Sequence, residues 1–171
     1  FLYIAKDMAL SYEYINNMIR SAPLHDIGKI GISDNILLKN GTFDDNEREY
    51  MKQHTILGGR ALQKLIDATD GESFLYIAKD MALSHHEKWN GTGYPYGLSG
   101  TNIPLSARIM AIADVYDALT SKRPYKQALS HSKAAEIIIE SSGTHFDPNI
   151  VGVFKSIHPK FEQVYKIYTQ E

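Results

Sequence analysis

The sequence predicts an all-α fold. Apolar residues recur three and four positions apart along several segments, which is the period of an amphipathic helix. No segment shows a convincing alternation of apolar and polar residues with the period of two that a half-buried strand requires. Glycines and prolines fall between the periodic segments, where they break helices. Together these patterns indicate helices joined by loops.

The first half of the chain contains three expected helices. Helical spacing of apolar residues indicates one over residues 15–22. Asp44 and Glu47 form a capping-box pattern before a second helix that runs to about Ile66. After a glycine break, residues 72–86 are expected to form the third.

The second half begins with a loop over residues 90–100, whose glycines and proline cannot share a helix interior. A helix is expected over residues 104–119, because proline suits a first turn. Ser130 can cap another helix that ends near residue 140. Pro148 is expected to open a short helix before a polar, tyrosine-rich tail.

Composition limits the classes of function. The 171 residues suit one domain, and 43% hydrophobic residues suffice for a core. The absence of cysteine excludes a disulfide scaffold and any thiolate metal site. A net charge of −2 gives no broad basic surface for nucleic acid. No apolar run approaches the roughly 20 residues of a membrane helix, so we expect no membrane contact and a cytoplasmic location.

The first candidate site is APLHDIGKIG at residues 22–31. His25, Asp26 and Lys29 would lie near one face of a helix. An imidazole supplies a nitrogen ligand, a carboxylate can bridge two metals, and an ammonium can reach a phosphate or supply a proton. A lone His-Asp pair is more often structural, so this dipeptide does not identify a site by itself.

Three further histidines extend the candidate site. His54 alone is typical of an ordinary histidine on an amphipathic helix. Consecutive helical positions point about 100° apart, so His85 and His86 are expected to serve different metals of a close pair. On the glycine-rich loop that follows, Tyr94 suits ligand contact and packing equally. Glu87 is interpreted as structural.

The segment 103–126 supplies the last candidates. Asp114 lies on an apolar helix face, where a carboxylate is costly unless it is paired or binds metal, so we expect it to be a ligand. Asp117 is expected to orient a ligand or to cap the helix. Arg123 and Lys126 form a cationic cluster that suits phosphate, although alone it would be a solvated turn.

The combination favours a metal centre. Imidazole and carboxylate ligands without thiolate suit iron, manganese, nickel or zinc rather than calcium. A pair of such ions supports in-line attack on a phosphoryl group, so metal-assisted phosphoester hydrolysis is the expected reaction class. The six candidate ligands are His25, Asp26, His54, His85, His86 and Asp114.

Four segments resemble the HD-GYP branch of the HD superfamily of metal-dependent phosphohydrolases, and the resemblance covers nearly the whole chain. The matching segments are HDIGKIG at 25–31, HHEKWNGTGYPYGLSG at 85–100, IPLSARIMAIADVYDALTSKRPYK at 103–126 and GTHFDP at 143–148. Asn90 stands where the family often has aspartate.

This resemblance implies an HD-superfamily helical bundle around a multinuclear site with two or three divalent ions, iron or manganese first and nickel or zinc as alternatives. It implies that the six candidates are metal ligands, that Asp26 bridges and that Lys29 assists the chemistry. It implies that Tyr94, Arg123 and Lys126 hold the substrate, cyclic di-GMP, which is linearised to pGpG or taken to GMP in bacterial second-messenger signalling. A sensor or receiver domain upstream and a homodimer are further expectations.

The beginning of the chain adds one more expectation. The family supplies another histidine ligand from a helix roughly thirty residues before the HD motif, which would precede Phe1. Residues 1–171 are therefore expected to be an N-terminally truncated HD-GYP catalytic domain that is poorly active. The segment FLYIAKDMALS occurs at 1–11 and again at 74–84. Two amphipathic helices of the same kind would not need identity over eleven residues, so the identity suggests a recent duplication.

Two other functions compete with this one. Another HD-superfamily phosphohydrolase, for instance a nucleotidase, would share the metal ligands but not the GYP loop. A non-catalytic module would bind a cyclic dinucleotide or a partner protein without turnover, and the intact visible ligand set argues against it.

Overall fold

The computed structural model describes residues 1–122 and 127–169, and the regular structure in these ranges is helical. The predicted all-α fold class is therefore confirmed. No described helix combines the length and the apolar character that crossing a bilayer would require. The α-helices are α1 (Leu2–Asp7), α2 (Tyr12–Ser21), α3 (Asp34–Leu37), α4 (Asp45–Ala68), α5 (Ser73–Ser84), α6 (Leu105–Thr120), α7 (His131–Glu140) and α8 (Pro148–Thr169), and the short 3-10 segments are η1 (Ala22–Leu24), η2 (Ile27–Gly31) and η3 (Gly100–Asn102).

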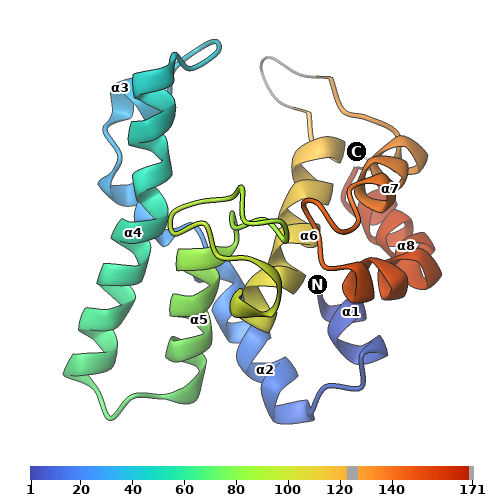
Figure 1. Ribbon diagram of the computed structural model, residues 1–171, viewed down its shortest axis with the longest axis horizontal. Coiled ribbons are helices and arrows are strands. Elements are labelled where there is room, and N and C mark those ends of the chain that lie inside the picture. Colours follow the sequence, from blue (N-terminus) through green and yellow to red (C-terminus); the bar gives the residue numbers. More distant parts are fainter. Residues whose placement is uncertain (123–126, 170–171) are drawn as a thin grey trace.

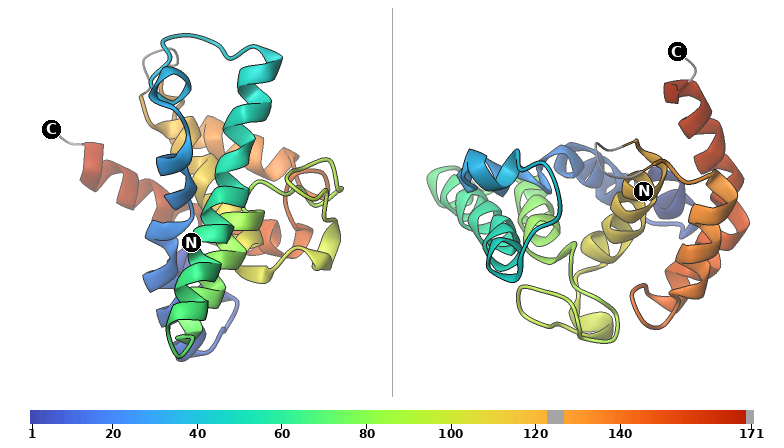
Figure 2. Two further views of the ribbon diagram at one scale, coloured as in Figure 1. Left: turned by 90° about the vertical axis from the view of Figure 1, so that its left-hand side faces the viewer. Right: turned by 90° about the horizontal axis from the view of Figure 1, so that it is seen from above.

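Two groups of helices flank the centre of the molecule. Helices α4 and α5 form an antiparallel pair on one side, α7 and α8 lie on the other, and α6 runs between them (Figure 1). The main core includes the fully buried Ile109, Ile138 and Phe154. A smaller core around Leu62 and Ala78 joins α4 to α5. The loop over residues 85–104 projects beside these elements in the side view and the view from above (Figure 2).

Helix starts follow the predicted caps. The carboxylate of Asp44 accepts the N–H of Glu47 at 2.9 Å, and the Glu47 carboxylate accepts the N–H of Asp44 at 2.9 Å, so the capping box of α4 is complete. The hydroxyl of Ser130 accepts the N–H of Lys133 at the start of α7. These two predictions are confirmed because a cap is a local interaction that needs no tertiary context.

The expectation of a short final helix is wrong. Helix α8 has 22 residues and continues through Pro159. Proline removes one backbone donor from a helix interior. Apolar side chains at helical spacing, including Ile150, Phe154 and Phe161, are nevertheless buried in the main core. This burial outweighs the local preference to stop.

The repeated segment folds in two ways. Its second copy, residues 74–84, is helical throughout, with Met81 and Ala82 fully buried. The first copy is helical only to Asp7, and Ala9 has a φ of 54°. Ser11 then caps α2 by accepting the N–H of Tyr14. Identical residues therefore form one long helix or a helix and a turn, according to what they pack against.

Candidate metal centre

The HD segment crosses α4 at a point of backbone contact. A Cβ at Gly28 would lie 1.9 Å from the carbonyl oxygen of His54 and 2.4 Å from the nitrogen of Gly58. Glycine alone permits this approach, which brings Asp26 beside His54. The expectation that His25, Asp26 and Lys29 share an α-helix is wrong, because the segment forms two 3-10 turns, η1 and η2.

Four predicted ligands form one compact group. Asp26, His54, His85 and His86 each offer a ligand atom, and these atoms all lie within 4.8 Å of one another. Oδ1 of Asp26 is 3.4 Å from Nε2 of His54 and 3.7 Å from Nε2 of His85. These three atoms are buried without a hydrogen-bond partner. An unpaired buried polar atom costs about 1–3 kcal/mol, and a cation would satisfy all three at once.

Backbone contacts orient the imidazoles. Nδ1 of His25, His54 and His85 lies 2.7 Å, 2.7 Å and 2.8 Å from a carbonyl oxygen three or four residues earlier. A carbonyl can only accept, so Nδ1 carries the hydrogen in each ring. The lone pair of Nε2 is then directed toward the centre, which is the orientation that metal-binding histidines adopt.

The second carboxylate oxygen of Asp26 faces a different set of partners. Oδ2 is 3.3 Å from Nε2 of His25 and 2.5 Å from Nζ of Lys29. Nε2 of His25 lies 4.0 Å from Oδ1 of Asp114. The two oxygens of one carboxylate therefore point at separate ligand sets, as bridging of two ions would require.

Electrostatics keep Asp26, His85 and His86 in metal-binding protonation states. Burial would raise the pKa of Asp26, but its contacts with His25 and with the ammonium of Lys29 hold it well below its usual range. Burial would lower the pKa of His25, but the contact with Asp26 raises it above its usual value. Burial lowers the pKa of His85 to about 4 and that of His86 to about 2. An ionised carboxylate and neutral imidazoles are the forms that bind metal.

The His85–His86 pair converges more than predicted. The expected 100° separation assumes that both residues lie within a helix, whereas α5 ends at Ser84. His85 is the C-terminal cap, and the two ring centroids are 4.0 Å apart. Both residues belong to the compact group, so the helical argument for assigning them to different ions does not apply.

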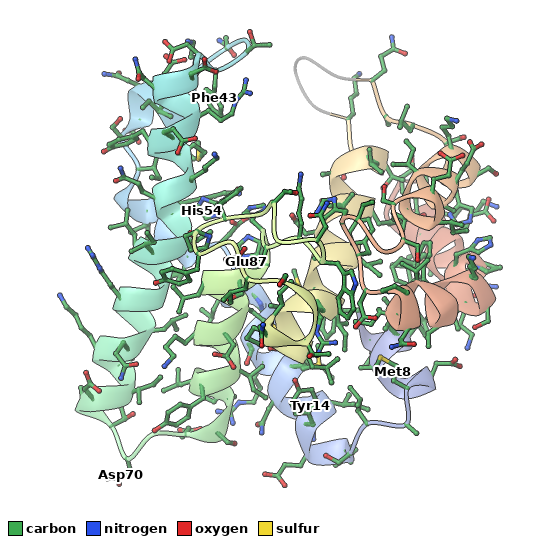
Figure 3. The ribbon with its side chains drawn as sticks, viewed as in Figure 1. Met8, Tyr14, Phe43, His54, Asp70 and Glu87 are labelled. Carbon is green, nitrogen blue, oxygen red and sulfur yellow. The ribbon has the colours of Figure 1, made fainter. Side chains whose placement is uncertain are left out.

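The glycine-rich loop brings Tyr94 to this group. The Tyr94 ring stacks on His86 with centroids 4.8 Å apart, and Nζ of Lys52 lies 5.4 Å from the tyrosine centroid. Sequence reasoning missed Lys52, because positions two apart on a helix, such as Lys52 and His54, do not face each other. Figure 3 labels His54 midway along α4, with Glu87 close to the middle of the molecule.

Three further predictions concern neighbouring residues. The carboxylate of Glu87 binds backbone amides of the loop, in accord with its structural interpretation. Asp117 accepts a hydrogen bond from the hydroxyl of Ser121 at the end of α6, which is a contact between side chains, so its orienting or capping role stays a prediction. Arg123 and Lys126 lie outside the described residues.

Comparison with known proteins places this centre in a family. A model of the HD domain matches residues 1–150. A cyclic di-GMP phosphodiesterase of Vibrio cholerae is 54% identical over 152 residues, which are 89% of this chain and 31% of that protein. A probable cyclic di-GMP phosphodiesterase of the same organism is 45% identical over 163 residues, which are 95% of this chain and 37% of that protein. The chain thus spans about a third of the length of these relatives.

A solved structure agrees at the level of the fold. The crystal structure of a cyclic GMP-AMP-specific phosphodiesterase of V. cholerae superposes with a TM-score of 0.69 at 20% identity, and the match covers 96% of this chain and 44% of that one. The helical-bundle fold that the motifs imply is therefore shared by this chain and that phosphodiesterase. With its HD motif, its histidine-rich centre and the matched domain model, the chain belongs to the HD domain family.

Proposed function

We propose that this chain is a metal-dependent phosphodiesterase that hydrolyses cyclic di-GMP to linear pGpG, GMP or both. The arrangement of Asp26 carries the proposal. One oxygen faces the unpaired nitrogens of His54 and His85, and the other faces His25. A bridging carboxylate suits two-metal phosphoryl chemistry, and the names of the similar V. cholerae proteins support the substrate class.

The ligand set divides between the two oxygens of Asp26. His54 and His85 lie beside Oδ1, His86 belongs to the same compact group, and His25, which is near Asp114, lies beside Oδ2. Two or three divalent ions bound here would supply an activated water and neutralise charge on the phosphoryl group. The mixture of imidazole and carboxylate suits iron, manganese, nickel or zinc, and the family resemblance puts iron or manganese first.

Lys29 and Tyr94 act on the substrate side of this proposal. The Lys29 side chain is 42% exposed while it contacts Asp26, so its ammonium can donate to a phosphate oxygen or to the leaving oxygen. Tyr94 presents an aromatic ring beside the centre, which suits a purine base. Arg123 and Lys126 are proposed phosphate contacts on sequence alone. A cytoplasmic location, an upstream regulatory domain and a homodimer belong to the same proposal.

A substrate panel tests the proposal. The protein is loaded with Mn²⁺ or, without oxygen, with Fe²⁺, and is given cyclic di-GMP, cyclic GMP-AMP and a nucleoside monophosphate. Chromatography of the products should show linear dinucleotide from cyclic di-GMP, and the isosteric Asp26→Asn variant should be inactive. Hydrolysis of the monophosphate alone would support a nucleotidase. Binding of cyclic di-GMP by the metal-loaded protein without turnover would support a non-catalytic module.

A further inference from the structure

Glu87 is a buried carboxylate directly after the two histidines of the centre. It is 2% exposed. One of its oxygens accepts the N–H of Tyr96 at 2.8 Å, and the other accepts the N–H of Leu98 at 3.0 Å. A buried carboxylate is costly unless it is hydrogen-bonded, so the loop amides and the carboxylate stabilise each other.

These two amides lie on the far limb of the loop, beyond Tyr94. The near limb is fixed by backbone contact, because a Cβ at Gly93 would come within 2.3 Å of the nitrogen of Lys88. The N–H of Tyr94 donates to the carbonyl oxygen of His86 at 3.3 Å. Glu87 therefore ties the second limb of the loop to the same short segment that holds the first.

The consequence concerns the Tyr94 ring. Its stacking on His86 depends on the course of the backbone on both sides of residue 94. The near side is held by the Tyr94 N–H and the far side by the Glu87 carboxylate. If the carboxylate were lost, the far limb would be free to move away and to carry Tyr94 off the histidine.

We infer that Glu87 is a positioning residue, which holds the loop of residues 91–98 so that Tyr94 stays beside the metal centre. The inference rests on the proposed function and deepens it. Glu87 would govern the use of a base-bearing dinucleotide, whereas a small phosphodiester without bases would need the metal ligands but not the loop.

The test uses the isosteric Glu87→Gln variant, whose amide oxygen can accept one N–H while its NH₂ group opposes the other. Asp80→Asn is the matched control, because Asp80 is a partly buried acid on α5 outside the loop contacts. Amide hydrogen exchange at Tyr96 and Leu98 is measured by NMR. It should accelerate about 10- to 100-fold in Glu87→Gln at one or both amides, as loss of a hydrogen bond to a charged group predicts, and stay unchanged in the control.

Turnover supplies the second measurement. In Glu87→Gln, KM for cyclic di-GMP should rise about 10- to 100-fold, while metal content and hydrolysis of bis(p-nitrophenyl) phosphate stay unchanged. Equal losses on both substrates, or unchanged exchange at both amides, would overturn the inference. If the wild type cleaves only the small diester, the proposed function fails, and the exchange result alone decides the role of Glu87. Glu87→Asp, whose carboxylate is one methylene shorter, should accelerate amide exchange at Tyr96 and Leu98 by the same factor. It replaces Glu87→Gln if that variant does not fold.

Discussion

The molecule holds two groups of histidines that differ in how their nitrogens are used. In the metal centre, Nδ1 of His54 and His85 is bound to the backbone, and Nε2 is buried without a partner beside Asp26. Between α6, α7 and α8, the hydroxyl of Tyr116 lies 2.8 Å from Nδ1 of His131, and Nε2 of His131 lies 3.0 Å from Nδ1 of His158.

The difference teaches which feature marks a metal site. Both groups are partly buried and bring imidazoles together, with ring centroids 5.2 Å apart for His131 and His158. In that pair both nitrogens of His131 already have partners, so its polar atoms are satisfied. Across residues 1–122 and 127–169, only the group around Asp26 places three or more ligand atoms within reach of one ion. Unpaired nitrogens that face a carboxylate, and not the number of histidines, therefore identify the centre.

Removal of the carboxylate should have the largest effect. Asp26→Ala deletes both oxygens, so metal affinity should fall by more than the roughly 10- to 100-fold that loss of an outer-shell partner causes. His54→Ala, which removes one nitrogen, should lose less metal, and His131→Phe should lose none. Elemental analysis and turnover of the three purified variants check this order. Full metal occupancy in Asp26→Ala would contradict the bridging assignment.

A bound metal ion should stabilise the fold through the histidines of the metal centre and not through His131 and His158. At about 100 times its Kd, an ion that binds the native state adds about 2.7 kcal/mol. For a domain of this size that raises Tm by roughly 5–11 °C. The shift with Mn²⁺ should vanish in His85→Ala and persist in His158→Phe, as measured by calorimetry. An equal shift in His85→Ala would mean that the ion binds elsewhere.

The second group should matter for stability instead. His131→Phe leaves the hydroxyl of Tyr116, a 6% exposed residue, without its partner, which should cost about 1–3 kcal/mol of unfolding free energy. Replacing both partners, as in Tyr116→Phe with His131→Phe, should recover part of this loss, because the hydroxyl that lost its partner is then removed as well. Urea denaturation at neutral pH measures both. Additive losses in the double variant would show that the two side chains do not act as a pair.

A smaller change in the free energy of unfolding should appear with pH. Burial lowers the pKa of His131, Glu162 opposes the shift, and His158 and Lys166 add to it. The folded pKa thus lies below the unfolded value of about 6.5, so the unfolded state takes up the proton first as the pH falls. The contribution of His131 is complete above that value and is lost as the pH falls through the folded pKa. The stability difference between wild type and His131→Phe should therefore narrow from pH 7.5 to pH 5. A difference independent of pH would refute this linkage.

The sequence was most informative where chemistry is local. The capping residues Asp44 and Ser130 could be recognised from short patterns, because each cap depends on neighbours in the chain. The repeat could not be resolved, since its two copies are identical and differ only in their flanking residues and their tertiary surroundings. The 3-10 form of the HD segment also depends on a contact with α4. The local sign of that contact is Gly58 within α4, because glycine weakens a helix interior and lies there against Gly28.

The backbone contact at Gly28 also determines which glycine substitutions a second mutation can compensate. A methyl group at Gly59 would strike the side chain of Leu83, 2.4 Å away, and a smaller residue at position 83 would make room for it. A methyl group at Gly28 would strike the carbonyl of His54 and the nitrogen of Gly58, which no substitution can trim. A genetic screen should thus recover suppressors of Gly59→Ala within the α4–α5 pair and none for Gly28→Ala. In the evolution of this centre, the spacing between the HD segment and α4 is less free to change than several of the side chains that it brings together.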